Sequence, residues 1–257
     1  MIAANAGRQS RRDELAGNLA AVRAQIAAAC QAAHRDPAEV TLIAVTKTFP
    51  ATDVALLAEL GVTDIGENRD AEAAEKAAEC VALGLSLHWH FVGQLQVNKA
   101  ASVVSYAYMV HSVDRSRLVT ALGRRATASG SEVRCLVQVN LDQASGRELT
   151  SQDVGRDAGQ GGRGGAAPGD VAGLADAIAA EPGLLLSGVM AVAPLGEDPL
   201  PAFSTLGEVS AQLRARHPQA SVISAGMSAD LAQAISRGAT HVRIGTALLG
   251  GRRAFVR

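Results

Sequence analysis

Two hydrophobic periods divide this chain into predicted helices and strands. Near the N-terminus, apolar side chains recur every three to four residues, which predicts one face of a helix over about residues 11–33. These side chains are Leu15, Leu19, Val22 and Ile26. The next block differs, because Val40–Val45 is a continuous run of apolar or β-branched residues. Such a run is typical of a strand that is buried on both faces.

Similar short apolar runs return along the chain, each followed by a segment with helical periodicity. The predicted strands cover residues 40–47, 63–68, 88–93, 108–113, 133–139, 184–192, 220–224 and 241–244. The predicted helices between them cover about residues 52–61, 70–83, 94–104, 114–129, 171–180, 201–217 and 228–237. Three of these helices have expected N-terminal caps, at Thr52-Asp53, Asp114 and Ser228.

Eight strands that alternate with helices favour an α/β fold, a (β/α)8 TIM barrel with an extra N-terminal helix. A doubly wound open sheet is the alternative, but no Gly-x-Gly-x-x-Gly motif follows the first strand. One segment interrupts the alternation. Residues 142–170 are rich in glycine, with Gly155, Gly159, Gly161, Gly162, Gly164, Gly165 and Gly169 close together. This composition can bury little surface, and it predicts a flexible loop inside a single domain that spans residues 1–257.

Composition and charge narrow the class of protein. The length of 257 residues is close to that of one α/β barrel. Hydrophobic residues make up 48% of the chain and aromatic residues only 3%, so the core must consist of Ala, Val, Leu and Ile. The formal net charge of -1 argues against nucleic acid or a membrane surface as a partner. The sequence has no run of eighteen apolar residues and no visible secretory signal.

The three cysteines, Cys30, Cys80 and Cys135, are scattered and lack the spacing of a metal site. They are expected to be small buried or half-buried side chains in a reducing cytoplasm.

The candidate chemistry begins at Lys47, which stands at the C-terminal end of the first strand. In a barrel, this is the end of the strands that carries the active site. A lysine that loses hydration there can attack a carbonyl group through its neutral amine. The other interpretation is a solvated lysine that ends a strand.

The last two predicted strands end in turns that suit a phosphate group. The seventh strand leads through Ser224, Gly226, Met227 and Ser228 into a helix, and the eighth through Arg243 to Gly245 and Thr246. Gly226 allows close approach of backbone to a ligand, and free N–H groups at a helix start attract anions. Loops after strands seven and eight are the frequent phosphate site of these barrels. Two tight turns with ordinary caps are the alternative interpretation.

A lysine and a phosphate site become neighbours when the barrel closes, because the first strand then lies beside the eighth. A ligand with an aldehyde and a phosphate satisfies both, and pyridoxal 5′-phosphate (PLP) is the common cofactor of that shape. Arg243 can then donate to the pyridine nitrogen. Because a guanidinium keeps its charge, that nitrogen would remain unprotonated and the ring would be a poor electron sink.

Several stretches, in order along nearly the whole chain, resemble the pyridoxal phosphate homeostasis protein family, the YggS/PROSC group. Its barrel is similar to the N-terminal domain of alanine racemase. The matching stretches are Ala44–Thr48, Gly66–Asn68, His88–Lys99, His111–Arg115, Gly188–Ala191, Gly226–Asp230 and Val242–Gly245.

The resemblance implies a Schiff base, a covalent imine between PLP and Lys47. It implies phosphate contacts around Ser228, Gly245 and Thr246, with Arg243 at the ring nitrogen and Asn68 near the ring hydroxyl. It also implies a cytoplasmic protein that acts in vitamin B6 and amino-acid homeostasis without established turnover. The expected partners are PLP, free amino acids and PLP-dependent apo-enzymes, and the expected assembly is a monomer or a weak homodimer.

The chain departs from the family pattern at three places. The family usually has Tyr after Gly-Glu-Asn, where this chain has Arg69, and usually has Met where this chain has Ala225. Arg69 therefore leaves the contacts on one side of the PLP ring unassigned. The pocket is expected to be slightly looser at Ala225. The segment 142–170 is also longer and richer in glycine than the family's usual loop.

The competing hypothesis is a PLP-dependent amino-acid racemase. Such enzymes need a second base on the opposite face of the cofactor, in alanine racemase a tyrosine from the second domain of a partner subunit. The only tyrosines here, Tyr106 and Tyr108, lie near the start of the fourth strand, at the wrong end of the barrel. His90, His111 and Cys135 remain as candidate bases, but such residues are more often structural within strands. We therefore predict a PLP-binding protein, a carrier without catalytic turnover.

Overall fold

Eight parallel strands close into a barrel in sequence order, with β8 returning to pair with β1. A computed structural model of the chain describes residues 2–142 and 164–251, with side chains from residue 6 onward. The strands are β1 (Thr41–Val45), β2 (Asp64–Glu67), β3 (His88–Phe91), β4 (Ala107–Val113), β5 (Val133–Gln138), β6 (Leu184–Met190), β7 (Val222–Ser224) and β8 (His241–Ile244). The predicted α/β TIM barrel is confirmed, and the open sheet is excluded.

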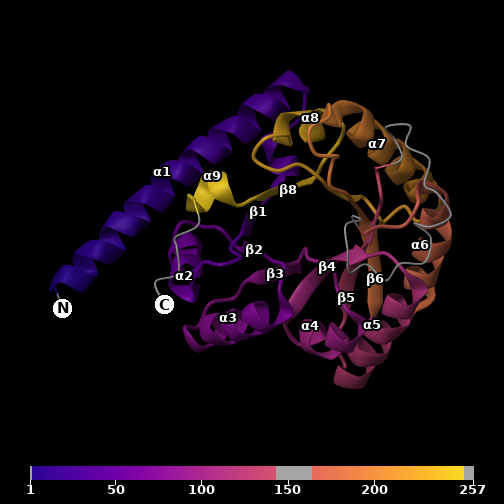
Figure 1. The fold of residues 1–257 in the computed structure, drawn as a ribbon, viewed down its shortest axis with the longest axis horizontal. Helices are drawn as coiled ribbons and strands as arrows, with labels where there is room; N and C mark the ends of the chain where they lie inside the picture. Colours follow the sequence, from indigo (N-terminus) through magenta and orange to yellow (C-terminus); the bar gives the residue numbers. More distant parts are fainter. Residues whose placement is uncertain (1, 143–163, 252–257) are drawn as a thin grey trace.

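Helices surround the strands on the outside of the ring (Figure 1). They are α1 (Ile2–Ala32), α2 (Ala51–Glu59), α3 (Asp70–Ala82), α4 (Ala100–Tyr106), α5 (Ser116–Ser129), α6 (Val171–Ala180), α7 (Pro199–Arg216), α8 (Leu231–Ser236) and α9 (Thr246–Leu249). Three short 3₁₀ helices, η1 (Pro37–Glu39), η2 (Val97–Lys99) and η3 (Pro168–Asp170), lie in connections.

The extra N-terminal helix is present and longer than predicted. α1 begins at Ile2 rather than near residue 11, and it runs along the outside of the ring past α9 and α8 (Figure 1). Its apolar stripe packs as the periodicity indicated, because the four side chains Leu15, Leu19, Val22 and Ile26 are all buried. The stripe shares one core cluster with residues of β1, β8 and α8. α1 therefore covers the strands on which the candidate site is built.

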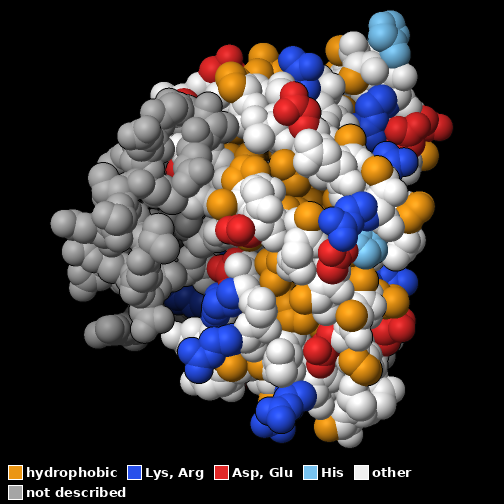
Figure 2. Space-filling view, turned by 90° about the vertical axis from the view of Figure 1, so that its right-hand side faces the viewer, with side chains coloured by type: hydrophobic (Ala, Val, Ile, Leu, Met, Phe, Trp, Pro, Cys, Tyr) orange, Lys and Arg blue, Asp and Glu red, His pale blue; other side chains and the backbone are white. Residues whose placement is uncertain are grey.

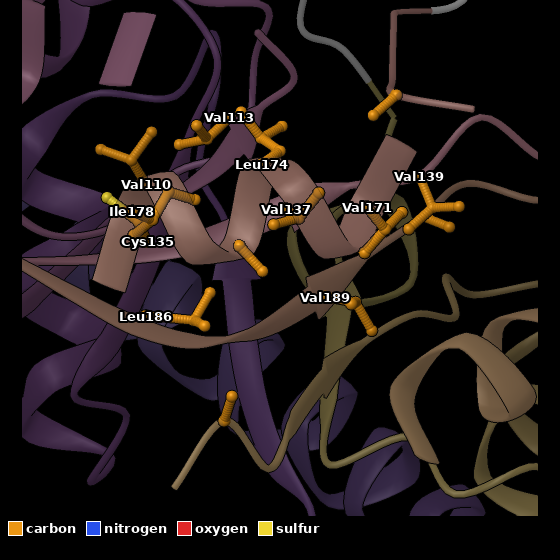
Figure 3. Close-up of a cluster of buried hydrophobic side chains, with 14 of the residues drawn as sticks. Val110, Val113, Cys135, Val137, Val139, Val171, Leu174, Ile178, Leu186 and Val189 are labelled. Carbon is orange, nitrogen blue, oxygen red and sulfur yellow. The ribbon is translucent and has the colours of Figure 1, made fainter. Parts of the chain in front are cut away.

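The rest of the core lies between the strands and the outer helices, as expected for this fold. Figure 3 shows one part, where Val171, Leu174 and Ile178 of α6 lie against Val137 of β5 and Val189 of β6. Small aliphatic side chains dominate this layer, in keeping with the low aromatic content. The packed layer holds the strand ends in fixed positions.

Three predicted caps are wrong. Thr52 and Asp53 lie inside α2, whose N-terminal cap is Pro50, and the buried Asp53 instead pairs with Arg11 of α1 at 2.7 Å. Asp114 does not cap α5, which begins at Ser116. Ser228 lies three residues before α8, in a turn. Asp53 is thus used in a tertiary ion pair, Asp114 pairs with the adjacent Arg115, and Ser228 belongs to a turn.

The glycine-rich segment is only partly described, because residues 143–163 lie outside the described ranges. At its end, Ala166 pairs in parallel with Val139 and exchanges backbone hydrogen bonds with Gln138 and Asn140. Gly165 has φ +142, and a Cβ there would lie 2.6 Å from the backbone nitrogen of Asn140. The predicted loop therefore extends too far, since residues 164–170 are bonded to β5 or form η3.

The surface carries mixed charge. On the face drawn in Figure 2, basic, acidic and apolar side chains are interspersed, and no large area of one charge is visible. Within residues 2–142 and 164–251, no helix is long and apolar enough to cross a membrane. The same residues contain no cluster of metal-ligating side chains.

Candidate functional site

The carboxyl ends of β7, β8 and β1 bring the predicted site residues together. β1 lies beside β8, and the backbone oxygen of Val45 would be 3.5 Å from a Cβ at Gly245. On the other side of β8, the amide of Arg243 donates to the carbonyl of Gly226 at 2.9 Å. Lys47, two residues beyond β1, therefore lies on the same rim as the turns after β7 and β8. The predicted proximity of lysine and turns follows from the closed barrel.

Lys47 differs from the other two lysines of the chain. Lys76 is buried and pairs with Glu67 at 2.5 Å and Glu72 at 3.2 Å. Lys99 is about half exposed and lies 3.8 Å from Asp70. Lys47 is partly buried and, among the described residues, has no ion pair and no side-chain hydrogen bond. It is the lysine whose amine is available to a ligand.

The turn that carries Lys47 is held by α3. The Lys76 ammonium donates to the carbonyl oxygen of Thr46 at 2.9 Å, and the Glu72 carboxylate accepts from the amide of Thr48 at 2.6 Å. Both residues flank Lys47 directly. Thr48 has φ 69, a left-handed conformation that is uncommon for a side chain with a branched β-carbon. Contacts from α3 therefore fix an otherwise unfavourable turn at the end of β1.

Glu67 completes this group and faces α3. Its side chain is fully buried, and Oε1 accepts from Thr46 Oγ1 at 2.6 Å and from Lys76. Burial raises the pKa of Glu67, and the adjacent Lys76 ammonium opposes that rise. We call Thr46, Glu67, Glu72 and Lys76 the α3 clamp. Glu67 ends β2, and the local sequence pattern did not indicate its contact to Lys76.

The turns after β7 and β8 present unpaired backbone donors. Within the described part of the chain, the amides of Ser228, Ala229, Thr246 and Ala247 donate to no protein acceptor, and all four residues are exposed. Gly226 has φ +90, and a Cβ there would lie 2.7 Å from Cβ of Ala234. Glycine is thus required where the β7 turn packs on α8. Four free N–H groups on two adjacent turns can bind an anion.

The details of the β7 turn differ from prediction. α8 has only six residues, and its start is preceded by a turn in which Asp230 Oδ1 accepts from the amide of Met227 at 2.6 Å. Ser228 is exposed and does not cap the helix. Neither its amide nor its hydroxyl has a hydrogen-bond partner in the described chain. Met227, with 37% exposure, lies at the same rim. After β8, the short helix α9 starts at Thr246 with Gly245 as its cap.

Arg243 is buried in the barrel with no carboxylate at ion-pair distance among the described residues. Its guanidinium donates to Ser224 Oγ at 2.8 Å and to the carbonyl of Ala191 at 2.9 Å. Burial lowers the pKa of Arg243 to about 10, and Asp230 opposes this effect. The group therefore remains charged at neutral pH. A guanidinium has five N–H donors, so donors remain for a further acceptor.

Asn68 also carries an unused polar atom. Its Oδ1 is buried and has no hydrogen-bond partner among the described residues. A Cβ at Gly93 would lie 2.2 Å from the Asn68 backbone oxygen, so the segment after β3 must have glycine there to pack against this residue. A buried polar atom without a partner is uncommon and costs free energy. Asn68 therefore suits contact with a ligand at the rim, whereas the neighbouring Arg69 is exposed.

The remaining candidate bases are buried or bonded to other side chains. Cys135 is fully buried, and burial raises the pKa of its thiol to about 12, so it is unreactive at neutral pH. His90 and His111 are hydrogen-bonded to each other inside the barrel at 2.9 Å. Tyr108 stacks on His88 near the amino ends of the strands. Tyr106 packs against the core outside the strands, with its hydroxyl beside Asp70 at the start of α3.

The comparisons with known proteins agree with this geometry. Residues 17–253 match the alanine racemase N-terminal domain family. The chain is 44% identical to a pyridoxal phosphate homeostasis protein of Mycobacterium bovis, over 95% of each chain. It is 34% identical to a protein of the same name from Escherichia coli K12, over 93% of this chain and 97% of that one.

A solved structure is similar over nearly the same span. PipY of Synechococcus elongatus PCC7942, described with PLP bound, superposes with a TM-score of 0.74 and is 30% identical. The match covers 92% of this chain and all of PipY. The free lysine, the anion-binding turns and the buried arginine therefore lie in a barrel whose relative holds the cofactor that the sequence indicated.

Proposed function

The chain belongs to the alanine racemase N-terminal domain family and, within it, to the pyridoxal phosphate homeostasis proteins, and from this premise we propose that it binds PLP as a Schiff base on Lys47. In this proposal the protein holds PLP for intracellular vitamin B6 and amino-acid homeostasis. Two kinds of support meet here. The relatives carry that function in their names, and one solved relative is described with PLP bound.

One observation carries the proposal: the only lysine without an ion pair in the described chain lies on the rim of the free backbone donors. Imine formation needs an unpaired amine, which Nζ of Lys47 would supply to the PLP aldehyde with loss of water. Lys76 is excluded because its ammonium holds three oxygen atoms. The α3 clamp keeps the backbone on both sides of Lys47 in place. The amine is thus presented by a rigid turn.

The other residues fit the remaining groups of PLP. The amides of Ser228 and Thr246, with their hydroxyls and the backbone at Gly245, suit a phosphate. The remaining N–H donors of Arg243 suit an acceptor such as the ring nitrogen, and the unpaired Oδ1 of Asn68 suits the ring hydroxyl. Ser224 is assigned differently from the sequence prediction, because its hydroxyl is already bonded to Arg243 and His111. We assign it to holding Arg243.

We further propose that the protein does not turn over amino acids. Arg243 leaves the ring nitrogen without a proton, so a bound substrate carbanion gains little stabilisation. Racemases compensate with two bases on opposite faces, and the described rim offers Lys47 without a tyrosine opposite it. The racemase alternative is therefore less supported. Free amino acids and PLP-dependent apo-enzymes remain the predicted partners, in the cytoplasm, with a monomer or weak homodimer as the predicted assembly.

The test is an absorbance spectrum of the purified protein with PLP. We expect an imine band in the wild type that borohydride abolishes, and no such band in Lys47→Ala. Lys99→Ala is the matched control, because Lys99 is also accessible to solvent, and it should keep the band. A Lys47→Ala protein with the wild-type spectrum would overturn the assignment.

Turnover is tested separately by proton NMR of L- and D-alanine in deuterated buffer with the PLP-loaded protein. We expect negligible loss of the Cα proton signal. Exchange at enzyme-like rates, roughly 1 per second or faster, that disappears in Lys47→Ala would favour the racemase instead.

A further inference from the structure

A line of polar side chains crosses the inside of the barrel and ends at Arg243. Asp64 Oδ1 lies 3.0 Å from His90 Nε2, and His90 Nδ1 lies 2.9 Å from His111 Nε2. His111 Nδ1 lies 2.9 Å from Ser224 Oγ, which accepts from Arg243 at 2.8 Å. We call these five residues the hydrogen-bond chain. The local sequence pattern gave no indication of it.

The hydrogen-bond chain passes through the lumen rather than along the sheet. His111 is on β4 and Ser224 is on β7, and these strands are not neighbours in the barrel. A direct bond between them must therefore cross the interior. Asp64 begins β2 and Ser224 ends β7, so the chain also runs from the amino ends of the strands to the carboxyl ends. Its members are buried, apart from the partly exposed Asp64.

Arg243 and Asp64, at the two ends of the hydrogen-bond chain, determine which atom donates in each hydrogen bond. A guanidinium can only donate, so Ser224 Oγ accepts from Arg243 and its own hydrogen is free for His111 Nδ1. A carboxylate can only accept, so His90 Nε2 must donate to Asp64. Burial raises the pKa of Asp64, but hydrogen bonds from His90 and Thr63 outweigh it and lower the value to about 2. Asp64 is therefore ionised at neutral pH.

The two histidines must then share one tautomer. With Asp64 as acceptor, His90 carries its proton on Nε2 and accepts at Nδ1. His111 donates to that Nδ1 from its own Nε2 and accepts from Ser224 at Nδ1. Every donor points from the carboxyl end to the amino end of the barrel. A second proton on His90 would place its Nδ1–H face to face with the Nε2–H of His111, and burial lowers the pKa of both rings.

We propose that Asp64, His90, His111 and Ser224 are positioning residues that hold the Arg243 guanidinium toward the cofactor ring. The inference rests on the proposed function. Arg243 has no carboxylate beside it in the described chain, so its orientation depends on neutral acceptors, Ser224 Oγ and the Ala191 carbonyl. The Ser224 oxygen is directed at Arg243 only while His111 takes the Ser224 hydrogen. His111 is in turn set by His90, and His90 by the charge of Asp64.

The first test uses the protein without cofactor, so it does not depend on PLP binding. Long-range proton–nitrogen NMR spectra of the six histidines distinguish rings protonated at Nε2 from rings protonated at Nδ1. We expect His90 and His111 both as the Nε2–H form at neutral pH. Asp64→Asn offers either an oxygen or an NH2 to His90, and it should give a mixture of both tautomers. A wild-type His111 protonated at Nδ1 would overturn the proposal.

The second test measures the effect at the cofactor. His111→Phe should weaken PLP retention roughly tenfold, the loss of about one hydrogen bond at Arg243, and should change the pH dependence of the imine band. His111→Asn, whose oxygen can still accept from Ser224, should recover part of both effects. His217→Phe is the control, because His217 is a partly buried histidine that follows α7 and is bonded to Asp176 of α6.

The outcomes separate the two proposals. If wild-type protein forms no imine, the proposed function is wrong. The tautomer measurement, made without PLP, still tests the hydrogen-bond chain independently. If wild-type protein forms the imine and His111→Phe behaves like His217→Phe in affinity and pH dependence, the positioning role is wrong and PLP binding stands.

Discussion

At the residue scale, Arg243 shows how a buried positive charge is kept without an adjacent carboxylate. Desolvation lowers its pKa to about 10, which still leaves it charged at neutral pH. Neutral oxygens of Ser224 and Ala191 accept two of its hydrogens. A buried charge that is not paired is costly unless hydrogen bonds offset the lost hydration. The remaining donors make this arginine suited to a ligand acceptor.

A first prediction concerns the phosphate turns. Ser228→Ala together with Thr246→Ala removes two exposed hydroxyls beside the free amides, and should weaken PLP retention by roughly 30- to 1,000-fold, at about 1–2 kcal/mol for each lost contact. Equilibrium dialysis measures the change. Ser221→Ala with Thr205→Ala, two hydroxyls outside the rim, should leave retention unchanged. Equal affinity in both double variants would place the phosphate elsewhere.

The sequence could indicate some site residues and not others for a physical reason. Lys47, Gly226 and Arg243 stand at or near strand ends, and a closed barrel brings strand ends together whatever the side chains are. The contacts of His111 and Lys76 depend on which residues meet across the lumen or between layers. Periodicity predicts that such residues are buried, but it does not predict their partners.

At the scale of elements, α3 does more than cover the sheet. Lys76 and Glu72 lie one turn apart on this helix and bind the backbone on either side of Lys47. Glu67, on the adjacent strand, neutralises the buried ammonium. The position of the reactive turn is thus coupled to the packing of one helix.

The α3 clamp can be tested with Lys76→Met. Loss of the ammonium leaves Glu67 buried without its partner, and should lower the free energy of unfolding by about 3 kcal/mol. Adding Glu67→Gln should recover part of the loss, because the uncompensated charge is removed. Lys99→Met is the control, since an exposed pair contributes about 1 kcal/mol or less. Urea unfolding gives the values, and equal losses for Lys76→Met and Lys99→Met would contradict the clamp.

The order of elements was predictable, and their ends were less so. Eight strands and the helices between them follow from hydrophobic periodicity, and α6 begins and ends where predicted. The start of α8 was misplaced, because Ser228 is a good cap residue that the structure uses in a turn. Ala166 was assigned to the loop because glycine surrounds it, although it bonds to the end of β5. Tertiary pairing overrides local composition in both cases.

At the scale of the whole molecule, burial in the barrel keeps three histidine rings neutral. Burial lowers the pKa of His90, lowers that of His111 well below its ordinary value, and lowers that of His241 to about 4. In the unfolded chain each would titrate near 6.5. Below that pH the unfolded state binds more protons than the folded state, so stability falls as the pH falls.

We therefore predict acid sensitivity between about pH 6.5 and 4. The free energy of unfolding should fall by up to about 1.4 kcal/mol per pH unit for each of the three histidines. Further loss below about pH 4 follows as Asp64 approaches its lowered pKa of about 2. Urea midpoints across this range measure how the free energy of unfolding changes with pH. His241→Gln should reduce this slope by the contribution of one histidine. A flat profile from pH 7 to 5 would mean that these rings accept protons in the folded state.

Borohydride reduction tests most directly whether PLP is bound through Lys47. The PLP-loaded protein is reduced with borohydride, digested, and mapped by mass spectrometry. With three lysines in the chain, the possible side-chain adducts are few. We expect the reduced adduct on Lys47 alone, with Lys76 and Lys99 unmodified. An adduct on Lys76 or Lys99 with Lys47 unmodified would contradict it.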